Sequence, residues 1–175
     1  SESRALNRAF IKYITTKKPF ILLKSAMSLD GKIATSTGES QWISCADSRA
    51  DVHRLRSEFT AVMTGIGTVL ADDPLLTART GNADAAQPIR VIADSRLRIP
   101  LDSKIAKSSR ESRTIVAVCA ETLAQDHSGE IASKAAALKA AGIELLPIRE
   151  QGEHLDLADL AVQLGKLEID SVLLE

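Results

Sequence analysis

Residues 61–74 read AVMTGIGTVLADDP and pass from a strand through a tight turn into a helix. The apolar run at 61–63 predicts a short buried strand that ends in the turn at 64–67. Residues 68–70 can open a helical turn, which Asp73 and Pro74 stop because a residue before proline avoids the helical region. A buried strand that leads directly into a helical turn is typical of α/β proteins.

The rest of the chain continues this alternation on both sides of that segment. Upstream, we expect a strand over about 20–28, a turn at Asp30 and Gly31, a short returning strand at 32–35, and a helix over 46–59. Downstream, we expect strands at 89–93, 114–120, 143–148 and 171–174, with helices over 131–141 and after the favourable N-cap Asp156. The sequence therefore predicts an α/β fold with a mainly parallel central sheet flanked by helices.

Composition narrows the functional class. The chain has 175 residues, 45% hydrophobic and 26% charged, with a net charge of -1, which suits one folded domain and excludes a disordered chain. The near-neutral charge and the 3% aromatic content predict no nucleic-acid partner and no membrane association. Two cysteines, Cys45 and Cys119, are too few for a disulfide framework, so we expect a cytoplasmic protein. The three histidines lack metal-ligand spacing, and we expect no metal site.

Polar residues collect where ligands bind in open α/β sheets, beyond the carboxyl ends of the strands. Lys24 lies within the first expected strand, where it either reaches water from an edge strand or stands at the floor of a cleft. Ser95 and its neighbours Arg96 and Arg98 could hold a ribose 2′-phosphate or form a solvated loop. Glu175 follows the last strand and is a candidate acceptor for a substrate hydroxyl.

The glycine turn has two interpretations. Gly65 and Gly67 lie between a strand and a helical turn, which suits backbone contact with phosphates, but a dinucleotide fingerprint is excluded because Leu70 occupies its third glycine position. A simple tight turn is the other interpretation. Asp72 and Asp73 favour a turn over a metal site, since further ligands are lacking nearby.

Three longer segments together resemble a known family. LLKSAMSLDGKIATSTGESQWIS at 22–44, RADVHRLRSEFTAVMTGIGTVLADDPLLTAR at 49–79 and PIRVIADSRLRIP at 88–100 are similar to the reductase domain of the bacterial bifunctional RibD family. The resemblance implies a dihydrofolate-reductase-like fold over 19–175, with residues 1–18 as a linker or leading helix. It also implies that the domain is C-terminally incomplete, because the family continues after the Glu175 position with a glycine-rich segment and further strands.

The resemblance also implies site residues, carried over position by position. For the cofactor, these are Ala26, Trp42, Gly65, Gly67, Thr68, Asp72 and Ser95. For the substrate, they are Ser40, Arg56, Leu76, Arg79 and Glu175. Lys24 would lie beside the reacting ribose carbon, so that Lys24 and Glu175 are the expected catalytic residues.

The implied activity is the NADPH-dependent reduction of 5-amino-6-(5-phosphoribosylamino)uracil in riboflavin biosynthesis, a small-molecule substrate. One alternative is reduction of the undeaminated diaminopyrimidinone phosphate, and another is a non-catalytic module that binds ligand or serves as an assembly interface. The segment ALNRAFIKYITTKKPF at 5–20 resembles the family's linker from a zinc deaminase domain, so we expect that domain upstream in a longer parent protein. Relatives of this fold also lead us to expect a homodimer.

Overall fold

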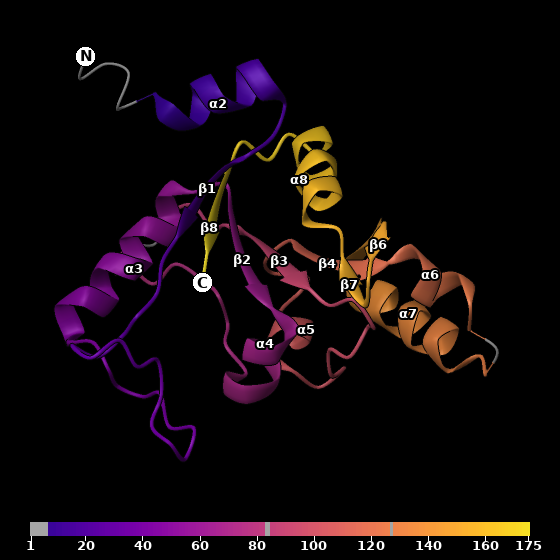
Figure 1. Ribbon diagram of the computed structural model, residues 1–175, viewed down its shortest axis with the longest axis horizontal. Helices are drawn as coiled ribbons and strands as arrows, with labels where there is room; N and C mark the ends of the chain where they lie inside the picture. The colour runs from indigo at the N-terminus through magenta and orange to yellow at the C-terminus, as the bar shows by residue number, and fades with distance from the viewer. Residues whose placement is uncertain (1–6, 83–84, 127) are drawn as a thin grey trace.

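A six-stranded parallel sheet forms the centre of the computed structural model, which describes residues 7–82, 85–126 and 128–175 (Figure 1). The strand order is β1-β8-β2-β3-β4-β5, and each neighbouring pair is parallel. The bounds are β1 Phe20–Leu23, β2 Ala61–Gly65, β3 Ile89–Ala93, β4 Thr114–Cys119, β5 Ile143–Ile148 and β8 Ser171–Leu174. The predicted α/β class with a mainly parallel sheet is confirmed.

Helices cover both faces of this sheet. They are α2 Arg8–Thr16, α3 Ala46–Glu58, α4 Ile66–Asp72, α5 Lys104–Lys107, α6 Ala120–Ala124, α7 Glu130–Ala141 and α8 Leu157–Lys166. Asp156 caps α8 as predicted, because its carboxylate accepts from the backbone N–H groups of Ala158 and Asp159. Gly142 ends α7 in the left-handed conformation that glycine adopts without steric cost. In the described part of the chain, no helix combines the length and the apolar character needed to cross a bilayer.

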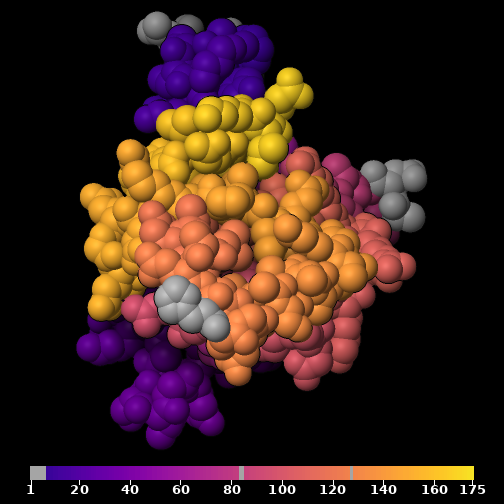
Figure 2. Space-filling model, turned by 90° about the vertical axis from the view of Figure 1, so that its right-hand side faces the viewer, coloured from indigo at the N-terminus to yellow at the C-terminus, as the bar shows by residue number. Residues whose placement is uncertain are grey.

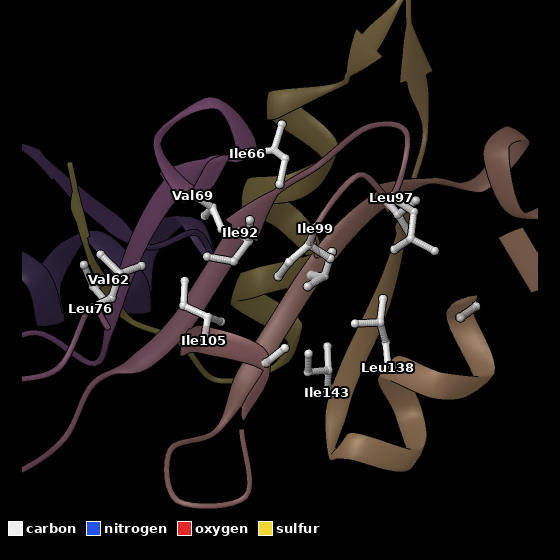
Figure 3. Packing of buried hydrophobic residues seen from close by; sticks show 14 residues of the cluster. Val62, Ile66, Val69, Leu76, Ile92, Leu97, Ile99, Ile105, Leu138 and Ile143 are labelled. Carbon is white, nitrogen blue, oxygen red and sulfur yellow. The ribbon is translucent and has the colours of Figure 1, made fainter. Parts of the chain in front are cut away.

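Alternate strand residues supply two hydrophobic cores, one on each face. Ile92 and Val116 pack with residues of α4, α5 and α7 in the first core, which Figure 3 shows at close range. Their chain neighbours Val91 and Ile115 pack in the second core with Leu160 of α8 and other residues. Because successive strand residues point to opposite faces, burial on both faces explains the continuous apolar runs in the sequence.

Two of the expected elements near the first strand are wrong. Strand β1 ends at Leu23 rather than near Ser28, because β8, its partner in the sheet, ends at Leu174. The Lys24 amide donates the last inter-strand hydrogen bond to the Leu174 carbonyl at 2.8 Å. Residues 32–35 form no strand, although the turn predicted at Asp30 and Gly31 is present, with Gly31 at φ 78°. The chain from Lys24 to α3 is therefore a long loop, which projects away from the sheet in Figures 1 and 2.

Three short elements were not expected from the sequence. These are α5, α6 and a two-stranded antiparallel hairpin of β6 Glu150–Gln151 and β7 His154–Leu155. Helix α6 takes Ala120, so β4 ends one residue earlier than predicted. The hairpin adjoins the end of β3, since the Leu155 amide donates to the Ser95 hydroxyl at 3.2 Å.

Helix α2 lies at one end of the molecule beside α8, opposite the long loop (Figure 2). The Tyr13 hydroxyl donates to the Gly165 carbonyl at 3.1 Å, which joins the two helices. The backbone of Lys17, just after α2, also approaches α8 closely at Gly165. A glycine is required at this position, because a Cβ atom there would stand 2.0 Å from the Lys17 carbonyl oxygen. Within 1–18, the leading-helix interpretation therefore describes residues 8–16, while residues 1–6 lie outside the described part of the chain.

A fully buried arginine fixes the loop that follows α4. The Arg90 guanidinium donates to the Leu75 carbonyl at 3.3 Å, to the Ser112 carbonyl at 2.9 Å and to the Thr114 hydroxyl at 2.7 Å. A guanidinium offers five N–H donors in a rigid plane, so a single side chain can tie strand β3 to several loops. The positions of residues 75–79, which line the site below, therefore depend on this core.

Candidate active site

The carboxyl ends of β1, β8 and β2 lie side by side at one edge of the sheet. Lys24 follows β1, Glu175 follows β8, and Gly65 ends β2. A cavity of about 680 Å³ opens beside these ends. Its position agrees with the rule that ligands of open α/β sheets bind outside the carboxyl ends of the strands.

Most residues expected to bind ligand line this cavity, called the larger cavity below, and they come from well-separated parts of the chain. They are Lys24, Ala26, Ser40, Trp42, Arg56, Thr68, Asp72, Leu76, Arg79 and Glu175. The long loop after β1, helix α3, helix α4 and the segment after α4 each supply some of them. The fold therefore brings basic, acidic and aromatic groups together around the larger cavity, although they lie in separate motifs of the sequence.

Three basic residues that line the larger cavity were missed, namely Arg49, His53 and Lys104. Arg49, His53 and Arg56 lie four and three positions apart on α3, so they share one face of that helix. This face borders the larger cavity, and α3 has no buried residue. The spacing of basic residues in RADVHRLR at 49–56 could have identified Arg49, His53 and Arg56 as one group.

The remaining expected residues, Gly65, Gly67 and Ser95, line a second cavity of about 630 Å³. This smaller cavity is also bordered by Arg96, Arg98 and the hairpin residue His154. Residues 64–68 divide the two cavities, since Thr64 and Thr68 line the larger one and Gly65 and Gly67 line the smaller one. A Cβ atom built at either glycine would meet nothing within 4 Å, so the turn faces open space.

Arg56 and Glu175 form a bidentate ion pair inside the larger cavity. Arg56 Nε and Nη2 donate to the two carboxylate oxygens of Glu175, each at 2.7 Å, and both side chains are only 12% exposed. Arg56 Nη1 also donates to the Thr77 carbonyl at 3.2 Å. Two N–H groups of the guanidinium remain for a ligand, because five are present and three are used here.

Glu175 is held in place by strand β2. Its backbone N–H donates to the Met63 carbonyl at 2.9 Å, and its carbonyl accepts from the Thr64 hydroxyl at 3.0 Å. The carboxylate is thus positioned by both its backbone and Arg56. Each of its oxygens keeps a lone pair that can accept from a ligand hydroxyl.

His53 lies between the two arginines of the larger cavity. Its Nδ1 atom is 3.2 Å from the Thr77 carbonyl oxygen, and its Nε2 atom is 3.3 Å from Arg79 Nη2. Burial, followed by the positive charges of Arg79 and Arg56, holds the pKa of His53 below its ordinary value. The imidazole is therefore neutral near pH 7.

Lys24 and Trp42 border the larger cavity from the long loop. Lys24 is half-buried, and within the described residues no carboxylate lies within ion-pair distance of its ammonium group. Trp42 is 71% exposed and is stacked by Arg49, whose guanidinium carbon lies 4.4 Å from the indole ring centroid. Arg49 in turn donates to the Ser44 carbonyl at 2.6 Å, which orients both side chains.

Two expected residues have structural roles as well. The Leu76 side chain is 2% exposed and belongs to the first core, and its φ of 55° turns the backbone sharply. Leu76 can therefore offer a ligand only its backbone. The Ser95 hydroxyl accepts from the Leu155 amide of the hairpin and also hydrogen-bonds with the Cys119 side chain. No group of three or more potential metal ligands occurs among the described residues.

A family model described as the RibD C-terminal domain matches residues 19–175. The riboflavin biosynthesis protein RibD of Actinobacillus pleuropneumoniae is 41% identical over 174 residues, which cover 99% of this chain and 43% of that protein. The 2,5-diamino-6-ribosylamino-4(3H)-pyrimidinone 5′-phosphate reductase of Archaeoglobus fulgidus is 42% identical over 109 residues, covering 58% of this chain and 49% of that protein.

Among solved structures, a RibD of Acinetobacter baumannii is similar to this chain, with a TM-score of 0.77 and 35% identity. The match covers 98% of this chain and 44% of that one. The chain thus spans less than half the length of the RibD proteins that it matches. The family-model match over 19–175 includes all six strands of the sheet and the residues that line both cavities.

Proposed function

The chain belongs to the RibD C-terminal domain family, and on that premise we propose that it reduces 5-amino-6-(5-phosphoribosylamino)uracil in riboflavin biosynthesis. The observation that carries the proposal is the convergence of every expected site residue on two cavities that share the turn at 64–68. A reductase needs adjoining places for a cofactor and a substrate. The paired cavities meet that need.

The residues around the turn fit a nicotinamide cofactor. When bound, such a cofactor supplies the hydride that reduces the substrate. Ala26, Trp42, Thr68 and Asp72 would hold it in the larger cavity, where Trp42 offers an exposed aromatic face. Gly65 and Gly67 leave open space for a ligand, since side chains are absent there.

The smaller cavity supports NADPH as the preferred cofactor. Arg96 and Arg98 border it beside Ser95, and both arginines are exposed. Guanidinium groups bind phosphate by charge-assisted hydrogen bonds, and two guanidinium groups lie here. This group of donors suits the 2′-phosphate that distinguishes NADPH from NADH.

The larger cavity would hold the phosphorylated substrate. Arg56 and Arg79 would bind its phosphate, and Ser40 and the Leu76 backbone would add hydrogen bonds. Glu175 would accept a hydrogen bond from a ribosyl hydroxyl. Fixed by Arg56 and by strand β2, its carboxylate requires little rearrangement to do so.

The reaction converts the open, imine form of the ribosylamino group into a ribitylamino group. The hydride adds to C1′, the electron pair of the C=N bond moves to nitrogen, and a proton completes the amine. The chain's contribution is to position C1′ and to exclude water around it. Lys24 would orient the ribosyl hydroxyls or deliver the proton, because its ammonium stands at the end of β1 without an acidic partner among the described residues.

The test is oxidation of NADPH by this chain in the presence of the ribosylaminouracil phosphate. We expect turnover by the wild type and a loss of about a hundredfold in Lys24→Ala. The exposed Lys12→Ala, on α2, serves as the control and should turn over normally. Normal turnover by Lys24→Ala would remove Lys24 from the mechanism.

A second candidate is reduction of the undeaminated diaminopyrimidinone phosphate. The Archaeoglobus relative, whose name states that activity, favours it. The linker resemblance at 5–20 favours the uracil substrate, since it places a deaminase upstream. Turnover of the two pyrimidines, measured side by side, separates the two substrates. Ligand binding without turnover of either would support the non-catalytic module.

We further propose the setting in which this domain works. In a longer parent protein, a zinc deaminase domain would precede it, and the domain would assemble as a homodimer in the cytoplasm. The length of the RibD relatives supports the first part, since this chain covers 43% of the Actinobacillus protein. Sedimentation of the parent protein would measure its assembly.

A further inference from the structure

His53 contacts Arg79 and shares the Thr77 carbonyl with Arg56, the two basic residues that would hold the phosphate, although no role was expected for it. It is half-buried on α3 and lines the larger cavity with Arg56 and Arg79. Its Nε2 atom lies 3.3 Å from Arg79 Nη2, and its Nδ1 atom lies 3.2 Å from the Thr77 carbonyl. The same carbonyl accepts from Arg56 Nη1 at 3.2 Å.

We assign the tautomer of the imidazole from its contact with Arg79. A guanidinium nitrogen can only donate, so Nε2 must be the unprotonated acceptor. Nδ1 then carries the hydrogen and donates it to the Thr77 carbonyl. The Arg79 amide is also directed at Nδ1, at 3.3 Å, and would donate to it in the other tautomer; we assign the shorter Thr77 contact as the hydrogen bond, and the nitrogen shifts described below test this assignment.

Arg79 depends on this contact more than the other cavity arginines do. Arg56 is held by Glu175, and Arg49 is held by Trp42 and the Ser44 carbonyl. Arg79 is exposed, and among the described residues it forms no ion pair with a carboxylate. His53 is the side chain that contacts its guanidinium there.

We propose that His53 is a positioning residue that holds the Arg79 guanidinium at the larger cavity, so that Arg79 and Arg56 together bind a sugar phosphate. A neutral acceptor suits this role. A carboxylate at the same place would compete with the phosphate for Arg79, whereas an imidazole orients Arg79 and leaves its positive charge for the ligand. The inference rests on the proposed function for the identity of the anion.

The first test measures binding of ribose 5-phosphate by calorimetry. We expect Arg79→Ala to weaken binding about tenfold and His53→Ala about fivefold. His53→Gln should stay within about twofold of the wild type, because the glutamine side-chain oxygen can accept near the place of Nε2. The double variant His53→Ala/Arg79→Ala should bind no more weakly than Arg79→Ala, since His53 acts through Arg79.

The control is Arg54→Ala, one position along α3 on its exposed face. It should leave ribose 5-phosphate binding unchanged, which separates positioning from a general effect on the helix. The proposal is overturned if His53→Ala binds like the wild type. It is also overturned if the His53→Ala effect persists in full when Arg79 is already alanine.

The second test needs no ligand. Imidazole ¹⁵N chemical shifts of the free protein should show the Nδ1-protonated tautomer, and Arg79→Ala should shift the population toward Nε2 protonation. An Nε2-protonated wild type would overturn the proposal. If the wild type failed to bind ribose 5-phosphate, the sugar-phosphate site of the proposed function would fall, while the nitrogen shifts would still decide the His53–Arg79 contact.

Discussion

Single residues of the site differ in how much the fold depends on them, and the Arg56–Glu175 pair is the clearest case. Both side chains are 12% exposed, and both carboxylate oxygens are used. Removing one partner of a buried ion pair leaves an uncompensated charge and costs more than the pair itself contributes. The pair therefore contributes to the stability of the fold as well as to the proposed ligand site.

Glu175→Gln should lower the free energy of unfolding by about 3 kcal/mol, because Arg56 would keep its charge without a counterion. Urea denaturation measures the change. The control is Glu58→Gln, which removes an exposed partner of Arg54 and should cost at most about 0.5 kcal/mol. Equal effects of the two variants would contradict the importance given to burial here.

The stability of the protein should depend on pH through His53. Burial and the charges of Arg79 and Arg56 lower the pKa of His53 in the folded state, while Thr77 and Glu175 oppose them with a smaller effect. Above the ordinary value of 6.5 both states are neutral, and the full stability is present. As the pH falls below 6.5, the unfolded state takes up a proton that the folded state resists, and stability declines.

Denaturation of the wild type and of His53→Gln between about pH 7.5 and about pH 5 measures this effect. The difference in unfolding free energy between the two proteins should shift in favour of the variant as the pH falls. A constant difference over that range would show that His53 titrates alike in both states.

At the scale of elements, the sequence predicted those whose apolar pattern is long and regular. Strands β2, β3, β5 and β8 and helices α3 and α7 lie within one or two residues of their expected bounds. Strand β1 was extended too far because Leu22, Lys24 and Ala26 alternate as in a strand, although pairing stops where β8 ends. The four-residue α5 and the two-residue hairpin strands are too short to show a period.

The candidate site was predictable mainly by resemblance. Composition and spacing had left Arg56 and Arg79 as ordinary charges, and only the family motifs predicted them as ligand positions. Neither source identified His53. Its proposed role follows from its contact with Arg79, which lies 26 residues away in the sequence. Contacts of that kind depend on how the segment after α4 packs on α3.

The contact of α2 with α8 provides a test at the same scale. Gly165→Ala should destabilise the protein by about 1 to 3 kcal/mol, because the added methyl group would overlap the Lys17 carbonyl. This cost must exceed the gain of about 1 kcal/mol that alanine gives over glycine within a helix. Thermal unfolding of this variant against the exposed Lys166→Ala measures it, and a more stable Gly165→Ala would show that α2 does not pack there.

At the scale of the whole molecule, the two cavities form one site only if a single ligand spans the turn at 64–68. Parallel strands bring their carboxyl ends to one edge, and the glycines at 65 and 67 leave the turn open on the side of the smaller cavity. A dinucleotide has the required shape, with a nicotinamide at one end and a phosphorylated ribose toward the other. Its two ends can therefore be tested separately.

Arg98→Ala tests the phosphorylated end. We expect NADPH to bind about tenfold more weakly and NADH to change less than about twofold, because only NADPH carries the 2′-phosphate. Fluorescence titration measures both affinities, with the exposed Arg110→Ala as the control. Equal losses for the two cofactors would remove the smaller cavity from cofactor selection.

The central claim is that this site transfers a hydride to C1′ of the ribosylamino group, and isotope transfer tests it most directly. The chain is incubated with the ribosylaminouracil phosphate and with NADPH that carries deuterium at both hydrogens of its nicotinamide C4, and the product is analysed by mass spectrometry. The account predicts one deuterium at C1′ of a ribitylamino product and a strong loss of that product in Lys24→Ala. An unlabelled product, or no product although both ligands bind, would contradict it.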